Sequence, residues 1–132
     1  MKVKIDTKEK FTVITPVISM LGDNFSDDLG NTLKDHLGHS MPNVVLNLQG
    51  VEEITETAAE QLAAIQQEFY NQSASFVICG LRQKVEEKLE QLELLEVMNV
   101  TPSESEAWDI VQMEEIEREL LDGDDISFEK QD

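Results

Sequence analysis

The sequence is short of cysteine, of proline and of positively charged residues. A single cysteine among 132 residues allows no internal disulfide, which agrees with a reducing compartment. Ten basic residues stand against 28 acidic ones, so the formal net charge is −18 and the phosphates of nucleic acids or anionic lipids are repelled. No apolar run is long enough to cross a bilayer, and the first ten residues lack the apolar segment of a signal peptide. We therefore expect a cytoplasmic protein that binds no nucleic acid and does not insert into a membrane.

The usual catalytic arrangements are also missing. The glycines do not cluster into a phosphate-binding loop, and no nucleophile elbow is present. His36 and His39 lie three residues apart, but Gly38 interrupts the helix and a third strong ligand is lacking, so a surface turn is expected rather than a metal site. Glu52 and Glu53 are adjacent in sequence and are expected to be solvated. The sequence therefore predicts no catalytic residue, no metal and no cofactor.

Hydrophobic periodicity predicts strands and helices in the order β-β-α-β-α-β-α-β-α. Two early segments alternate apolar and polar residues, and the polar link 7–10 between them predicts a hairpin. Two later runs are continuously apolar, which is typical of central strands buried on both faces. Pro16 cannot donate to a ladder and is expected at a strand end, an edge or a bulge. The predicted strands are residues 2–6, 11–17, 43–48, 75–79 and 96–100.

Four helices are predicted from start signals and from apolar residues at helical spacing. The first begins near Asp23 and Asn24 and ends at Gly38. The last begins at a capping box formed by Ser103 and Glu106. The apolar stripes are Phe25, Leu29, Leu33 and Leu37 in the first helix, Ala58, Leu62, Ile65 and Phe69 in the second, Val85, Leu89 and Leu92 in the third, and Ala107, Ile110, Val111 and Leu120 in the last.

These elements predict an α/β fold. Strand–helix–strand units with short links imply parallel neighbours and right-handed crossovers. We expect one small domain, residues 1–121, with a mixed β-sheet that opens with an antiparallel hairpin, continues with parallel strands and packs against about four helices. Residues 122–132 are expected to form an acidic, disordered tail. Trp108 is expected to anchor the last helix to the core, and Cys79 to be a small buried hydrophobe rather than a nucleophile.

Negative charge concentrates in the C-terminal third, where residues 86–132 hold seventeen acidic and three basic residues. This pattern has two interpretations. It is either a solvated, solubilising surface or a docking face for a basic partner. Charge alone is weak evidence for a partner, and the solvated surface is the preferred interpretation.

The junction between the strand at 43–48 and the second helix carries a cluster of side-chain oxygens. Thr57 and Glu60 match a capping box, and Thr55 is a rival cap earlier in the chain. A hydroxyl at a helix N-terminus is also a favourable place for a phosphate, because free N–H groups and the positive end of the helix dipole meet it there. Thr57 is therefore interpreted as a helix cap, a phosphorylation site or both.

The sequence resembles the STAS domain family, which is shared by bacterial anti-sigma factor antagonists and the cytoplasmic tails of sulfate transporters. The likeness covers roughly residues 3–120 and lies in the element order and in three segments: FTVITPVISMLGDN, NVVLNLQGVEEIT and FVICGLRQKVEEKLEQLELLEV. Members commonly carry Asp-Ser-Ser/Thr-Gly at the start of the second helix, and a kinase phosphorylates the second hydroxyl. Here the four residues are Thr55-Glu56-Thr57-Ala58, so Thr57 falls on the acceptor position.

The resemblance implies a non-enzymatic, cytoplasmic interaction module. Its partner would be an anti-sigma factor or a histidine-kinase-like serine/threonine kinase, with a serine/threonine phosphatase as a further partner. Thr57 would be phosphorylated, while Asp23, Asn24, Thr55 and Glu56 would line the contact surface. Two alternatives remain: a STAS-like scaffold or transporter-accessory subunit without phosphoregulation, and an enzyme on a similar frame.

Overall fold

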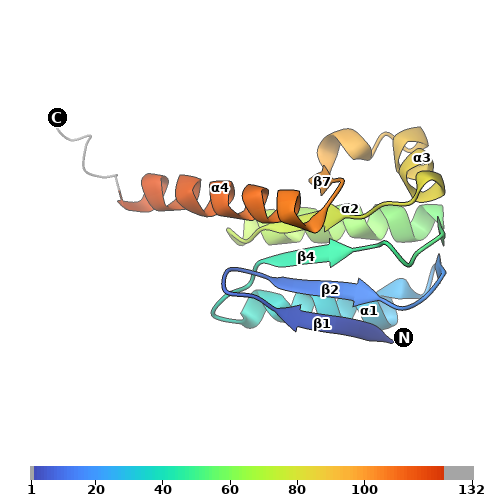
Figure 1. Cartoon of the computed structure of the whole chain (residues 1–132), viewed down its shortest axis with the longest axis horizontal. Coiled ribbons are helices and arrows are strands. Elements are labelled where there is room, and N and C mark those ends of the chain that lie inside the picture. Colours follow the sequence, from blue (N-terminus) through green and yellow to red (C-terminus); the bar gives the residue numbers. More distant parts are fainter. Residues whose placement is uncertain (1, 124–132) are drawn as a thin grey trace.

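A mixed five-stranded sheet forms the centre of the molecule (Figure 1). The structure is a computed structural model that describes residues 2–123. The sheet has the strand order β1-β2-β4-β6-β7. The first two strands pair antiparallel and the others join in parallel, which confirms the predicted fold class. The strands are β1 (Val3–Thr7), β2 (Thr12–Pro16), β4 (Val44–Asn47), β6 (Phe76–Cys79) and β7 (Val100–Thr101).

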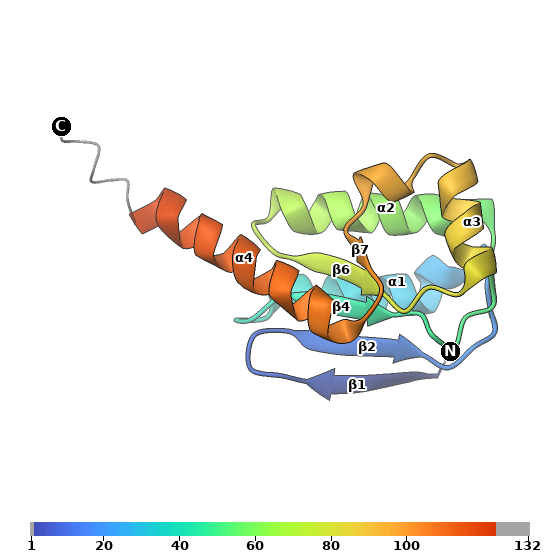
Figure 2. The same cartoon turned by 45° about the horizontal axis from the view of Figure 1, so that its top comes forward.

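Helices cover both faces of this sheet. α1 (Phe25–Asp35) and α2 (Glu56–Asn71) lie side by side on one face, while α4 (Glu104–Gly123) crosses the other (Figure 2). α3 (Gln83–Gln91) lies at the end of the molecule where the parallel strands finish. Two connections are short 3₁₀ helices, at His36–Gly38 and Leu95–Val97.

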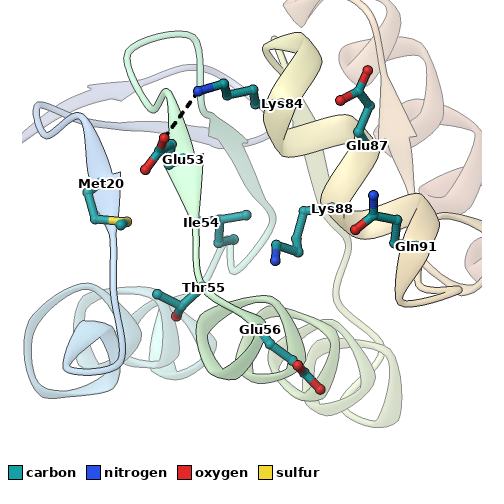
Figure 3. Close-up of a pocket in the computed structure, with 9 residues that line it drawn as sticks. All are labelled: Met20, Glu53, Ile54, Thr55, Glu56, Lys84, Glu87, Lys88 and Gln91. Carbon is teal, nitrogen blue, oxygen red and sulfur yellow. Dashed lines mark hydrogen bonds and ion pairs between the residues drawn. The ribbon is translucent and has the colours of Figure 1, made fainter.

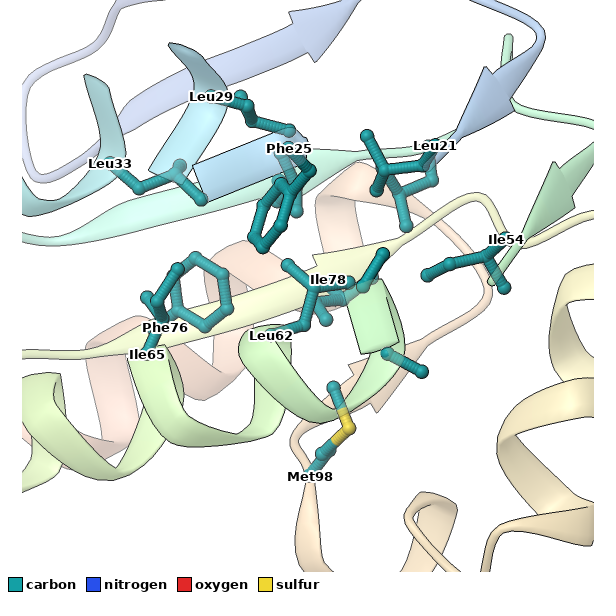
Figure 4. Close-up of a cluster of buried hydrophobic side chains, with 14 of the residues drawn as sticks. Leu21, Phe25, Leu29, Leu33, Ile54, Leu62, Ile65, Phe76, Ile78 and Met98 are labelled. Carbon is teal, nitrogen blue, oxygen red and sulfur yellow. The ribbon is translucent and has the colours of Figure 1, made fainter. Parts of the chain in front are cut away.

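Side-chain alternation in the central strands divides the core into two layers. Successive strand residues point to opposite faces of a sheet. In β6, Phe76 and Ile78 join the large cluster beneath α1 and α2, which Figure 4 shows. Val77 and Cys79 face the smaller cluster beneath α4. Cys79 is fully buried, as expected of a small hydrophobe.

The region before α4 differs from the prediction of a strand at residues 96–100. Residues 95–97 form a 3₁₀ helix, and the strand is only Val100–Thr101. Hydrophobicity at Val97 and Met98 produced the error, because Val97 is exposed and Met98 packs into the core from irregular backbone. The capping residue Ser103 was predicted correctly, since its Oγ accepts a hydrogen bond from the Glu106 amide at 3.3 Å.

Two side chains lie elsewhere than predicted. Trp108 remains 37% exposed, and the neighbouring Ala107 and Val111 fix α4 to the sheet instead. Trp108 follows Ala107 directly, so it lies about 100° around the helix from Ala107 and at the edge of the buried face. His36 is buried and not on a surface turn, and its Nδ1 lies 3.0 Å from the Thr32 carbonyl oxygen.

α4 passes residue 121, where the predicted domain ends, and continues to Gly123. Most of the predicted acidic tail, residues 124–132, lies outside the described residues. Among residues 2–123, none of the helices combines the length and the apolar character that crossing a membrane requires.

Candidate functional site

Two short strands that the sequence did not reveal bring the predicted site residues together. β3 (Met20–Leu21) and β5 (Glu53–Ile54) pair in parallel as a separate two-stranded sheet. The chain after β3 leads into α1, and the chain after β5 leads into α2. The pairing therefore places the N-termini of both helices at the carboxyl end of the main sheet.

Backbone hydrogen bonds on either side of this bridge fix the alignment. The Ser19 carbonyl accepts from the Glu52 amide at 2.7 Å, and the Leu21 carbonyl accepts from the Thr55 amide at 3.0 Å. Leu21 and Ile54 are both buried in the large core cluster. The site's scaffold is thus held by core packing as well as by the ladder.

Thr55, rather than Thr57, caps α2. Its backbone is extended, with φ −81° and ψ 162°, and its Oγ1 accepts a hydrogen bond from the Ala58 amide at 3.2 Å. Its carbonyl also accepts from the Ala59 amide at 2.9 Å. The predicted capping box of Thr57 and Glu60 is therefore wrong, because Thr57 is already the second residue of the helix.

Because Thr55 caps the helix, the Thr57 hydroxyl is not needed as a cap. The Thr57 side chain is exposed, and no hydrogen bond to another described residue occupies its hydroxyl. The amides of Ala58 and Ala59 are satisfied by Thr55, whereas those of Glu56 and Thr57 precede the first intrahelical bond. An anion attached at Thr57 would meet these open N–H groups and the positive end of the helix dipole.

The loop between β3 and α1 contributes the other predicted residues. Asp23 and Asn24 are both exposed. Asn24 occupies the N-cap position of α1 with φ −87° and ψ 9°, and its side chain makes no capping hydrogen bond. The structure thus places Asp23, Asn24, Thr55, Glu56 and Thr57 at the starts of two neighbouring helices, with polar groups facing outward.

A groove of about 530 Å³ lies next to this junction, between β5 and α3 (Figure 3). Thr55 and Glu56 line one side, and α3 supplies the other with Lys84, Glu87, Lys88 and Gln91. The Lys84 ammonium lies 3.2 Å from Glu53, while the Lys88 amine points toward Ile54 and Thr55. The α3 wall was not predicted as part of the site, although two lysines four residues apart in an acidic region were a visible signal.

The single cysteine is poorly suited to act as a nucleophile. Burial, with a smaller contribution from the charge of Glu104, raises the pKa of the Cys79 thiol to about 11. The thiol is therefore protonated at neutral pH and poorly nucleophilic. The described residues contain no cluster of three or more histidine, cysteine, aspartate or glutamate side chains that could hold a metal ion.

Comparison with known proteins identifies the family to which this chain is similar. The sequence profile described as "STAS domain" matches residues 3–107. Among solved structures, a Thermotoga maritima protein classed as an anti-sigma factor antagonist aligns with TM-score 0.75 and 18% identity over 83% of this chain and 94% of its own. The unphosphorylated form of the anti-sigma factor antagonist SpoIIAA aligns with TM-score 0.66 and 12% identity over 84% of this chain and 96% of its own.

The murine Slc26a9 anion transporter aligns with TM-score 0.66 and 15% identity over 79% of this chain, but over only 18% of the transporter. No curated protein sequence matches the chain. Likeness at these identities establishes the fold alone, whereas the profile covers most of the sequence. The chain belongs to the STAS domain family.

Proposed function

We propose that this chain is a non-enzymatic regulatory module that acts as an anti-sigma factor antagonist. It binds an anti-sigma factor or a histidine-kinase-like serine/threonine kinase through the Asp23–Asn24 loop and the start of α2. Phosphorylation of Thr57 switches this binding off, and a serine/threonine phosphatase restores it. The observation that supports the proposal best is the exposed, unbonded Thr57 hydroxyl on the first turn of a helix that Thr55 already caps.

The fold can accept a phosphate at Thr57 without rearrangement. A phosphate adds about −2 charge and three acceptor oxygens. The open amides of Glu56 and Thr57 and the dipole of α2 favour that charge. The backbone thus tolerates the modification, while a partner seated on the same surface meets a new dianion. The switch would act on the interface rather than on folding.

The altered motif retains the structural role of the family's first residue. Aspartate and threonine both accept hydrogen bonds as N-caps, and Thr55 does so here. Glu56 is exposed and Thr55 lines the groove, whereas Ala58 is fully buried, so the replacements at positions 55 and 56 change the surface that a kinase or partner meets. A kinase for this chain would need to accept a carboxylate directly before the target hydroxyl.

Phosphate-affinity gels and mass spectrometry test the proposal after incubation with ATP and a histidine-kinase-like serine/threonine kinase from the same genome. We expect one phosphate on the wild-type chain, none on Thr57→Ala and one on Thr55→Ser, which keeps the cap. The unmodified chain should also co-elute with that kinase in gel filtration, and the phosphorylated chain should not. An unmodified Thr57 together with no complex would refute the switch.

A second candidate is a STAS scaffold or transporter-accessory subunit without phosphoregulation. Glu56 supports it, because this carboxylate already places a fixed negative charge on the first turn of α2. The two functions differ in one measurement. If Thr57→Ala and Thr57→Glu both bind the partner as tightly as the wild type, the scaffold is favoured over the switch.

A further inference from the structure

The distal half of α4 carries an apolar stripe. The stripe lies outside both hydrophobic clusters that the described residues form. Met113, Ile116 and Leu120 are 59%, 55% and 61% exposed. Their spacing of three and four residues places them on one face of the helix. Figure 1 shows α4 running past the sheet at the end opposite the start of α2. The stripe is therefore remote from Thr57.

The opposite face of α4 is held by a partly buried polar network, which leaves the stripe pointing outward. Glu114 accepts from the Ser75 hydroxyl at 2.6 Å, and Arg118 donates to the same hydroxyl at 3.2 Å. Glu115 accepts from the Asn43 amide group at 2.6 Å. These polar side chains lie on the same face of α4 as the buried Ala107 and Val111. Rotating the apolar stripe onto the sheet would therefore break the polar network. Arg118 lies in this network.

The charges that border the stripe are all negative. Arg118 is the sole basic residue of α4 and points inward, which leaves only carboxylates around the apolar face. The exposed carboxylates nearest in helical position are Asp109, Glu117 and Glu119. Pairing with a second copy would bring two such acidic rims together, each on a chain with a formal net charge of −18. A partner with apolar residues between lysines or arginines complements both features.

We propose that the distal half of α4 is a second docking surface, which receives a basic amphipathic helix from a partner protein. An apolar face read at positions i, i+3 and i+7 is the usual mode by which one helix recognises another. The STAS profile ends at residue 107, so this surface lies beyond the part of the chain that the profile covers. It would act independently of the state of Thr57.

A matched pair of synthetic peptides tests the surface on the full-length chain. Both have about 18 residues, long enough to form a helix, and place leucines at i, i+3 and i+7. Lysines flank the leucines in one peptide and glutamates in the other. We expect the lysine peptide to bind at least about tenfold more tightly in fluorescence anisotropy, and its affinity to fall as salt rises. Equal binding of the two peptides, or no binding of the lysine peptide, overturns the proposal.

Variants separate this surface from general attraction to an acidic protein. The triple variant Met113→Gln, Ile116→Gln and Leu120→Gln keeps every charge and should bind the lysine peptide at least about tenfold more weakly. The control Tyr70→Gln and Val97→Gln removes two other exposed apolar side chains and should bind like the wild type. Unchanged binding by the triple variant would show that charge alone attracts the peptide, which overturns the proposal.

Three further measurements locate the bound peptide, test for a second copy as the occupant and separate this surface from the proposed switch. Bound lysine peptide should slow amide hydrogen exchange in residues 109–121, and protection confined to other regions contradicts the docking surface. Sedimentation equilibrium should give a monomer for the wild type alone. A wild-type dimer that the triple variant abolishes would assign the stripe to a second copy and refute our assignment. Kinase treatment of the triple variant should still modify Thr57, so failure here does not depend on the proposed switch.

Discussion

Substitutions at Thr55 and Thr57 should have opposite consequences, because one hydroxyl caps α2 and the other is free. Thr55→Ala removes the acceptor of the Ala58 amide and leaves that N–H at the helix start without its side-chain partner. Loss of an N-cap of this kind costs about 1 kcal/mol. For a domain of this size, that lowers the melting temperature by about 4 °C.

Thr57→Ala should change the free energy of unfolding by less than about 0.5 kcal/mol. The side chain that it removes is exposed and makes no hydrogen bond to another described residue. Thr57→Glu should be equally mild. The helix dipole stabilises its carboxylate by about 0.3–1 kcal/mol, while repulsion from Glu60 three residues on offsets a few tenths of that. Any loss of partner binding in Thr57→Glu is then an effect on the interface and not on the fold.

Urea unfolding followed by circular dichroism measures these differences, with equal slopes showing that only stability has changed. Ser103→Ala provides a matched control, because Ser103 caps α4 by the same type of hydrogen bond and should also cost about 1 kcal/mol. If Thr57→Ala proved as destabilising as Ser103→Ala while Thr55→Ala was silent, the cap would be Thr57. Its hydroxyl would then not be free, and the main support for the proposed switch would be lost.

Four other predictions concern the frame around the site. Asn43→Ala removes the acceptor of the buried Ser75 amide at 2.8 Å and should lower the free energy of unfolding by about 1–3 kcal/mol in urea titration. Gly80→Ala should cost about 1–3 kcal/mol in the same assay, because Gly80 has φ +73° and an added Cβ would lie 2.7 Å from the Asn47 Oδ1. The Cys79 thiol should react with a chromogenic disulfide reagent no faster than the chain unfolds, and rapid labelling of the native protein would contradict its burial. Because the pKa of Cys79 is raised to about 11, its contribution to stability should be lost as the pH rises from about 9 toward 11, and this pH dependence should be absent in Cys79→Val.

The main sheet and the helices were predictable because the spacing of apolar residues in long segments shows which faces are buried. Val45 and Val77 face one layer, and their neighbours Leu46 and Phe76 face the other, so a run without polar residues marks a strand covered on both sides. The helical stripes report one covered face in the same way. The predictions failed where an apolar side chain is not buried. Val97 is apolar but exposed, and Trp108 is large but lies beside the buried face of its helix.

The sequence singled out residues at the starts of α1 and α2 for the candidate site, but it did not reveal how they are arranged. β3 and β5 contain two residues each, which is too short for any period to show. Thr57 with Glu60 satisfied the pattern of a capping box, yet the ladder between Leu21 and Thr55 sets the end of β5 and so makes Thr55 the cap. A tertiary hydrogen bond decided between two local motifs that the sequence left equivalent.

This arrangement explains how an altered motif can retain the frame of the family site. The bridge is held by Leu21 and Ile54, which are buried in the core, and by backbone hydrogen bonds that do not depend on side-chain identity. Thr55 needs only an oxygen at its position to cap α2, and Glu56 and Thr57 point outward. The exposed residues can therefore change to suit a particular kinase or partner while the two helix starts keep their relative position.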